Sequence, residues 1–456
     1  MRPLSKIDES SDAALPGLER IISPENHPIT AEMIDRDALY ILRKLRDAGF
    51  AGYLVGGGVR DLYLGKTPKD FDISTDARPG QLRKLFPNSN TIGRRFRLVQ
   101  IFFRGGKTIE ISTLRSLSEH DLDGPEAVLA PNNTFGTLSE DARRRDLTIN
   151  SLFFEIETST IIDYVNGSQD LDRGIIRIVG EPVKRISHDP VRMLRAIRHA
   201  ARINFTIEEH TWKALCSNSD KLSLCPPSRL RDEFLKDLYS GAAAPWFELA
   251  VDSGLLFALF PFYRKTLAGN PAAAAHTRTL LSGICQTIDR INSLSLELKI
   301  HRQPDFVLLG LFLIPWVETR FQLISQFRKG APLYQLAKQI REEIDQTIGI
   351  QLNLRRSLRQ EMVSLLINLS QLIHNKQLNS WPKWLKRKSY FKRSLLFYHF
   401  YMAADTGASI DHLLIAEPVM QPAAEEIKTF DREFIPPKSR PAFAQKSKGG
   451  IFGFKK

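Results

Sequence analysis

Residues 54–74 read LVGGGVRDLYLGKTPKDFDIS, and this stretch decides the fold of the N-terminal part of the chain. An apolar run leads into three consecutive glycines at positions 56–58, and an amphipathic segment follows them. After a break at Gly65 and Pro68, a second apolar run begins at Phe71. The pattern predicts a strand, a glycine turn, a short helix, a loop and a second strand.

Two aspartates bracket Phe71 in the second predicted strand. Because strand side chains alternate between faces, Asp70 and Asp72 are expected on one face while Phe71 points into the core. Two carboxylates so placed repel each other unless a cation lies between them, and Mg²⁺ prefers such oxygen ligands. Glycines let backbone N–H groups approach an anion closely. Together these features predict metal-assisted chemistry on a nucleoside triphosphate.

The full string, with Arg60 and Asp61 after the glycines, resembles the signature of class II nucleotidyltransferases. This family includes tRNA CCA-adding enzymes and bacterial poly(A) polymerases. The resemblance implies that Gly57, Gly58 and Arg60 lie in the turn that holds the incoming triphosphate. It also implies that Asp70 and Asp72 are catalytic ligands of two Mg²⁺ ions. The alternative is a buried turn followed by two surface aspartates.

The composition sets bounds on the class of protein. The chain has 456 residues, a formal net charge of +13 and 43% hydrophobic residues, which favours a globular protein with a polyanionic partner. Three widely spaced cysteines and the lack of an apolar N-terminal segment favour the cytoplasm. The longest apolar stretch, 306–317, is too short to span a membrane and predicts a buried helix.

The chain is expected to form an α+β protein. A flexible leader (1–30) precedes a catalytic head (31–165) that contains a small mixed β-sheet. From Ile175 onward the pattern is helical, which predicts an all-α neck (166–240) and body (241–430). The segment 431–456 is rich in Pro, Gly and Lys and is expected to be a disordered basic tail.

A third carboxylate is predicted on a neighbouring strand. Residues 108–113 return from a hairpin turn, and Glu110 lies on the face opposite Ile109 and Ile111. Two-metal transfer often needs a third carboxylate, so Glu110 is a candidate catalytic residue. An ordinary solvent-facing glutamate is an equally good interpretation.

The string at 143–152, RRRDLTINSL, contains a second group of candidates. Arginine forks suit phosphate oxygens, and asparagine can bind a hydroxyl group. The family resemblance places the matching residues near the ribose and triphosphate of the nucleotide. The alternative is a charge cluster at the start of a helix. The nucleotide-binding candidates here are Arg144, Arg145, Asp146 and Asn150.

The segment 189–202 predicts a helix with Asp189 as its N-cap and Pro190 at its first position. Arginines at 192, 195, 198 and 202 form one basic stripe, which could be only a solvated face. The resemblance implies that Asp189 and Arg192 read the edge of the base, with Arg195 and Arg198 beside them. His188 stands where the family usually has an acidic residue.

Two further stretches extend this interpretation. The segment at 226–236 resembles the last motif of the family, which implies that Arg229, Arg231 and Glu233 brace the base pocket. Basic and aromatic residues alternate at 381–393, which favours contact with RNA over a packed aromatic face covered by lysines. The predicted RNA-binding residues are Lys383, Lys386, Arg387, Lys388, Lys392 and Arg393.

The sequence therefore predicts a template-independent polymerase that adds AMP from ATP to RNA 3′ ends, with Mg²⁺ as cofactor. The segment at 92–101, IGRRFRLVQI, favours poly(A) polymerases over CCA-adding relatives. CCA addition to tRNA is the first alternative, and a non-catalytic RNA-binding protein of the same fold is the second. Partners in RNA decay are compatible with this interpretation, and the oligomeric state is left open.

Overall fold

The computed structural model describes residues 19–93, 98–116, 134–267, 270–376 and 381–415. These ranges belong to one compact unit that ends at Ile415. The predicted tail at 431–456 and residues 1–18 of the predicted leader lie outside the described residues.

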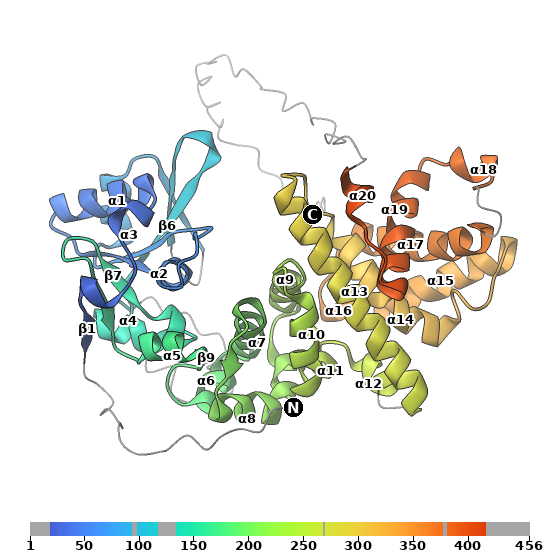
Figure 1. Ribbon diagram of the computed structural model, residues 1–456, viewed down its shortest axis with the longest axis horizontal. Coiled ribbons are helices and arrows are strands. Elements are labelled where there is room, and N and C mark those ends of the chain that lie inside the picture. Colours follow the sequence, from blue (N-terminus) through green and yellow to red (C-terminus); the bar gives the residue numbers. More distant parts are fainter. Residues whose placement is uncertain (1–18, 94–97, 117–133, 268–269, 377–380, 416–456) are drawn as a thin grey trace, which may run out of the picture. The chain divides into compact units, whose positions relative to one another are not determined.

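A mixed sheet forms the N-terminal part of this unit (Figure 1). Within the described residues its order is β1-β8-β7-β2-β3-β6-β5-β4, and β3 and β6 are its parallel neighbours. The strands are β1 (Arg20–Ile22), β2 (Gly52–Val55), β3 (Asp72–Thr75), β4 (Ser89–Ile92), β5 (Leu98–Phe102), β6 (Thr108–Thr113), β7 (Phe153–Glu155) and β8 (Thr160–Asp163). The predicted strand that leads into the glycine turn and the predicted strand at 108–113 are thereby confirmed.

The sheet begins earlier than the sequence predicted. Strand β1 pairs antiparallel with β8, with Arg20 opposite Asp163. Ile22 and Ile29 are buried, and the His27 ring contacts the carbonyl oxygen of Ser159 at 2.8 Å. The prediction of a flexible leader over 1–30 is therefore wrong from residue 20 onward, because these isoleucines bury apolar surface against the sheet.

Short helices flank the strands: α1 (Arg36–Asp47), α2 (Gly57–Tyr63), α3 (Pro79–Leu85), α4 (Leu138–Arg144) and α5 (Gly167–Arg173). Helix α1 starts where Asp35 accepts hydrogen bonds from the backbone N–H groups of Asp37 and Ala38. Its apolar stripe, which includes Ile41 and Leu45, is buried in the core.

Four helices follow the sheet: α6 (Pro182–His188), α7 (Val191–Ile203), α8 (Glu209–Ser217) and α9 (Pro227–Leu238). Two short strands pair in parallel beside them: β9 (Ile175–Ile176) precedes α6, and β10 (Thr206–Ile207) lies between α7 and α8. The prediction of a purely helical neck is wrong at this point. Ile176 and Ile207 are buried, and two residues are too few to show a strand period in the sequence.

The remaining elements of the described part of the chain are all helices (Figure 1). The helices are α10 (Ala243–Asp252), α11 (Leu255–Leu259), α12 (Pro261–Leu267), α13 (Pro271–Glu297), α14 (Asp305–Phe321), α15 (Gly330–Gln346), α16 (Ile348–Gln351), α17 (Arg356–Asn375), α18 (Lys383–Lys386), α19 (Phe391–Thr406) and α20 (Asp411–Ile415). Residues 307–317 of α14 are all buried, which confirms the buried helix predicted there. Among the described residues, none of the helices is both long and apolar enough to cross a membrane.

Candidate functional site

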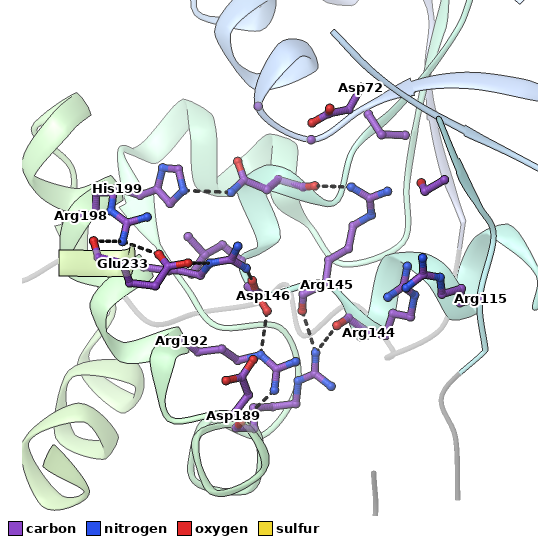
Figure 2. A pocket seen from close by; sticks show the side chains of 18 of the residues that line it. Asp72, Arg115, Arg144, Arg145, Asp146, Asp189, Arg192, Arg198, His199 and Glu233 are labelled. Carbon is purple, nitrogen blue, oxygen red and sulfur yellow. Dashed lines mark hydrogen bonds and ion pairs between the residues drawn. The ribbon is translucent and has the colours of Figure 1, made fainter. Parts of the chain in front are cut away.

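A cavity of about 720 Å³ lies between the sheet and helices α6, α7 and α9 (Figure 2). Both apolar strands and charged helix faces contribute to its lining. Most of the predicted site residues line it: Gly57, Asp72, Glu110, Arg144, Arg145, Asp146, Asn150, Asp189, Arg192, Arg195 and Arg198. Three other predicted site residues, Asp70, Gly58 and Arg60, are not part of the lining.

The glycine turn opens α2 at the edge of this cavity. Gly56 has φ +70° and ψ −138°, a backbone conformation that L side chains rarely adopt. Gly58 has a different role, because a Cβ there would come within 3.3 Å of the Asp70 carbonyl oxygen. Gly58 therefore lets α2 approach the segment before β3, and of the two glycines predicted to bind nucleotide only Gly57 faces the cavity.

The two lining carboxylates lie on neighbouring parallel strands. Asp72 on β3 is the register partner of Glu110 on β6. Desolvation, followed by repulsion from Glu110 and Asp70, raises the pKa of Asp72 to about 6, against the effect of Arg145. Glu110 is thus beside the aspartate, as its catalytic interpretation required. Asp70 precedes the strand, which begins at Asp72, so the predicted alternation within one strand does not hold for it.

This donor set fits a magnesium ion of open coordination. Its carboxylates are hard oxygen ligands that repel one another, which is the condition that a divalent cation relieves. Within the described part of the chain, no three His, Cys, Asp or Glu side chains form a closed metal site. An ion held by Asp72 and Glu110, with Asp70 near them, would take its remaining ligands from water and substrate phosphates.

A buried aspartate that sequence reasoning missed positions two of the arginines. Asp141 is fully buried and accepts hydrogen bonds from Nε of Arg144 at 2.8 Å and Nε of Arg145 at 3.1 Å. Against the raising effect of burial, these arginines lower the pKa of Asp141. The sequence did contain a signal for these contacts. Asp141 lies three residues before Arg144 and four before Arg145, and residues at these spacings are neighbours on a helix.

Asp146 is tightly held by the basic stripe of α7. Its carboxylate accepts a hydrogen bond from Nε of Arg192 at 2.8 Å and is also ion-paired with Arg195. Against burial, Arg195 and Arg192 hold the pKa of Asp146 well below its usual range. Arg192 also donates to the Arg185 carbonyl oxygen at 2.8 Å. Three arginines of the stripe, Arg192, Arg195 and Arg198, are therefore ion-paired and line the cavity, whereas Arg202 is exposed and does not line it.

Asp189 lies between α6 and α7 and does not cap α7. The N-cap position is Pro190, and no side chain makes a cap hydrogen bond there. Instead Oδ2 of Asp189 accepts a hydrogen bond from Nη2 of Arg229 at 2.7 Å. Oδ1 of Asp189 and Nη1 of Arg229 are buried without a hydrogen-bond partner among the described residues. The predicted cap is wrong because the α9 arginine competes for the carboxylate.

Two predicted nucleotide-binding arginines are engaged within the protein. Arg198 is 8% exposed and bonds to Glu233 and Asp237 on α9. Arg60 is 3% exposed and contacts Asp61, Asn150 and His199 behind the glycine turn.

Of the three predicted brace residues, Arg229 and Glu233 line the cavity, whereas Arg231 does not. Arg231 donates instead to the carbonyl oxygen of Asn353 at 3.1 Å. His199 also lines the cavity, and sequence reasoning missed it because a lone histidine on a helix carries no motif.

The six predicted RNA-binding residues lie from α18 to the first turn of α19, and all are exposed. Trp381 packs edge-on against Tyr398 with ring centroids 5.4 Å apart, while Trp384 is 53% exposed. Arg393 forms an ion pair with Glu361 at 3.0 Å. This surface combines both sequence interpretations, with one aromatic ring packed and another open to solvent.

Comparison with known proteins gives two family matches. Residues 52–177 match the family described as "Poly A polymerase head domain". Residues 204–267 match the family described as "Probable RNA and SrmB- binding site of polymerase A". The first match contains the glycine turn and the carboxylates, and the second contains Arg229 and Glu233 of the cavity.

Individual proteins that are similar to this chain include poly(A) polymerases and CCA-adding enzymes. The chain is 40% identical over 305 residues to "Poly(A) polymerase I" of Salmonella typhi, a match that covers 65% of this chain and 64% of that protein. It is 38% identical over 219 residues to the "CCA-adding enzyme" of Lactobacillus helveticus, covering 48% and 53% of the two chains. The chain thus spans less than two thirds of the length of these relatives.

A solved structure supports the fold alone. "The structure of CCA-adding enzyme apo form II" is similar to this chain with a TM-score of 0.50 and 22% identity, over 84% of this chain and 96% of that one. The predicted fold, a mixed-sheet head of nucleotidyltransferase type followed by helical regions, is confirmed.

Proposed function

We propose that this chain, which is similar to poly(A) polymerases and CCA-adding enzymes, adds AMP from ATP to RNA 3′ ends without a template. One observation carries the proposal. The adjacent carboxylates Asp72 and Glu110 face a cavity whose other walls hold several arginines. Such a cavity offers oxygen ligands for a cation on one side and donors for phosphate oxygens on the other.

In the proposed reaction the 3′-hydroxyl oxygen of RNA forms a bond to the α-phosphorus of ATP. The bond from that phosphorus to the bridging oxygen breaks, pyrophosphate leaves and the hydroxyl proton is released. Mg²⁺, held by Asp72 and Glu110 with Asp70 near them, would supply neutralisation of the phosphate charge and a lower pKa of the hydroxyl. Arg144 and Arg145, fixed by Asp141, would orient the triphosphate through charged hydrogen bonds.

The base is proposed to bind beside Asp189. Its Oδ1 is a buried acceptor without a partner among the described residues, and the amino group of adenine or cytosine donates to such an atom. Guanine and uracil present a carbonyl oxygen at the equivalent position and would repel it. Arg192 remains the proposed second reader of the base, and Arg229 holds the aspartate in place. The acceptor on Asp189 should therefore favour ATP and CTP over GTP and UTP.

Polyadenylation is preferred over CCA addition because of how far the similarity extends. The match to the Salmonella poly(A) polymerase covers 65% of the chain, against 48% for the Lactobacillus CCA-adding enzyme. CCA addition remains the second candidate, since a CCA-adding enzyme shares the fold over 84% of the chain. The RNA strand is proposed to contact the exposed cations of α18 and α19.

An extension assay tests the proposal. Purified protein with Mg²⁺ is given an unstructured RNA or a tRNA without its CCA end, each with ATP, CTP or both. A long ladder on the unstructured RNA with ATP alone is expected. Growth of the tRNA by only three nucleotides, and only with both substrates, would instead establish CCA addition. No extension of either RNA would favour the non-catalytic alternative.

A further inference from the structure

Two tryptophans three residues apart near α18 have opposite surroundings. The Trp381 ring packs edge-on against Phe391 and Tyr398, with ring centroids 6.3 and 5.4 Å apart. Trp384 lies on α18 (Figure 1), and 53% of its surface is exposed. Leu385, the next residue, is buried in the hydrophobic core. Trp381 and Leu385 therefore hold this segment in place, and Trp384 is turned away from the core.

The faces of the Trp384 indole are open within the described ranges. No other aromatic ring there stacks on the indole, and no lysine or arginine side chain lies over its face. Trp381 packs against the hydrophobic core, whereas Trp384 does not. A single exposed apolar side chain is common on protein surfaces, so the exposure of Trp384 alone does not indicate a site.

The charges around Trp384 provide a second observation. Lys383 precedes the tryptophan, and Arg387 and Lys388 follow it by three and four residues, spacings that are neighbours on a helical turn. The backbone N–H of Arg387 donates to the Lys383 carbonyl oxygen at 3.3 Å, so this turn extends to Arg387. All three cations are exposed and have no ion-pair partner in the part of the chain that the structure describes. No acidic residue occurs from Trp384 to Arg393, so positive charge without local compensation surrounds an open aromatic ring.

An open ring among cations matches a ligand that has both flat faces and negative charges. We propose that Trp384 stacks on an unpaired base of RNA while the neighbouring cations bind its phosphates; the choice of RNA as the ligand rests on the proposed function. Every base has a π face, so such stacking tolerates any sequence. Cations alone bind paired and unpaired RNA alike. The indole can stack only on a base that is not already inside a duplex, so Trp384 makes this surface selective for single-stranded RNA.

An anionic membrane is the other partner that tryptophan and lysine side chains suit. Binding to a membrane surface requires an apolar helix face that enters the lipid. Helix α18 has four residues, and its other large apolar side chain, Leu385, is buried. One open ring surrounded by cations therefore fits stacking on a base better than insertion into lipid.

The test is equilibrium binding of short oligo(A), oligo(U) and an RNA duplex to four proteins, without ATP or Mg²⁺. These are the unmodified chain and its Trp384→Leu, Trp384→Phe and Tyr334→Leu variants. Leucine keeps apolar bulk but has no flat ring, and phenylalanine keeps a smaller ring. Tyr334 is the matched control, because it is 72% exposed on α15, where Lys338 one turn later is paired with Glu342.

Trp384→Leu should weaken the binding of oligo(A) about fivefold or more, as the loss of one stacked base implies, and should leave duplex binding within about twofold. Trp384→Phe should lose less, and Tyr334→Leu should lose nothing. The slope of log K against log salt should not change in Trp384→Leu, because no phosphate contact is removed. Oligo(A) should lose more affinity than oligo(U), since purines stack more strongly.

Quenching of tryptophan emission gives a direct readout of stacking. The chain has five tryptophans, and the emission that oligo(A) quenches in the unmodified chain should be missing from Trp384→Leu. Equal weakening of oligo(A) and duplex by Trp384→Leu, or weakening of neither, would overturn the stacking site. An equal loss in Tyr334→Leu would overturn it as well. Tighter binding to anionic lipid vesicles than to RNA, dependent on Trp384, would assign the surface to a membrane instead.

The stacking site and the proposed function fail in different ways. If oligo(A) binding depends on Trp384 but no AMP is added to RNA, the proposed function fails and the stacking site stands. If RNA is extended and Trp384→Leu binds oligo(A) like the unmodified chain, the stacking site fails alone. Unchanged duplex binding and an unchanged Tm in Trp384→Leu show that its fold is intact, so that a loss of oligo(A) binding belongs to the ring.

Discussion

Two groups of cationic side chains in this molecule differ in what surrounds them. The arginines of α7 that face the cavity are paired with acids, as Arg192 and Arg195 are with Asp146 and Arg198 is with Glu233. On α18 and the start of α19, five of the six basic side chains have no ion-pair partner among the described residues. These are Lys383, Lys386, Arg387, Lys388 and Lys392.

The difference indicates what each group can do. A paired, half-buried guanidinium is held in one geometry and can position a ligand, but it adds little net charge. An exposed, unpaired lysine retains its full charge and its freedom, which suits a contact with RNA phosphates that depends on salt and not on sequence. The cavity is therefore expected to control chemistry and selectivity, and the α18–α19 surface to control affinity.

The largest expected effect comes from the carboxylates of the cavity. Asp72→Asn keeps the shape of the side chain and removes the charge that would hold a divalent cation, so nucleotide addition should fall at least about 10³-fold. RNA binding should change by less than about twofold, because the affinity surface is elsewhere. Single-turnover extension and filter binding measure the two quantities.

Asp76→Asn is the matched control for this prediction, since Asp76 is an exposed aspartate that follows the same strand and does not line the cavity. A fully active Asp72→Asn protein would contradict the metal-ligand role.

A smaller effect is expected when an internal ion pair of the cavity wall is broken. Glu233 is 5% exposed and accepts a hydrogen bond from Arg198 at 2.5 Å. Glu233→Gln removes one of the two negative charges that pair with the buried Arg198. The free energy of unfolding should therefore fall by about 2–3 kcal/mol. Denaturant unfolding measures it. Asp232→Asn, one residue earlier and exposed, should cost less than about 0.5 kcal/mol.

The unpaired cations should affect affinity and its dependence on salt. Replacing Lys383, Lys386, Arg387 and Lys388 by alanine should lower RNA affinity about tenfold at physiological salt. The slope of log K against log salt should fall by about 3, at 0.7 per lost phosphate contact. Arg393→Ala provides the comparison within the same surface, because Glu361 already compensates its charge and a smaller loss is expected. Equal effects per residue would contradict the difference between paired and unpaired cations on this surface.

The smallest effect expected is on acid stability. Against desolvation, Arg198 lowers the pKa of Glu233 to about 2, below its ordinary value of 4.5. A depressed carboxyl pKa contributes stability above pH 4.5, and that contribution is lost as the pH falls from 4.5 toward 2. Between pH 4.5 and 3.5 the loss from this group should be about 1 kcal/mol. Glu233→Gln should flatten the stability curve in this range, and an unchanged curve would contradict the assignment.

Local patterns in the sequence determined most of the head. The glycine turn, the strand before it and the carboxylates after it are adjacent in the chain, and short-range steric and apolar patterns specify them. The resemblance carried by those same residues led to the family, and most of the residues it marked do line one cavity. The buried helix α14 was equally clear, because an uninterrupted apolar run admits few other structures.

Only the tertiary structure decided which partner each charged group has. Asp189 could cap a helix or pair with an arginine forty residues later, and the packing of α9 against α7 chose the arginine. The packing of α7 against the head gave Arg192 to Asp146 and placed His199 against Arg60 and Asn150. The sequence names the groups that can form hydrogen bonds and ion pairs. Their pairing depends on distances between elements far apart in the chain, which only the folded structure defines.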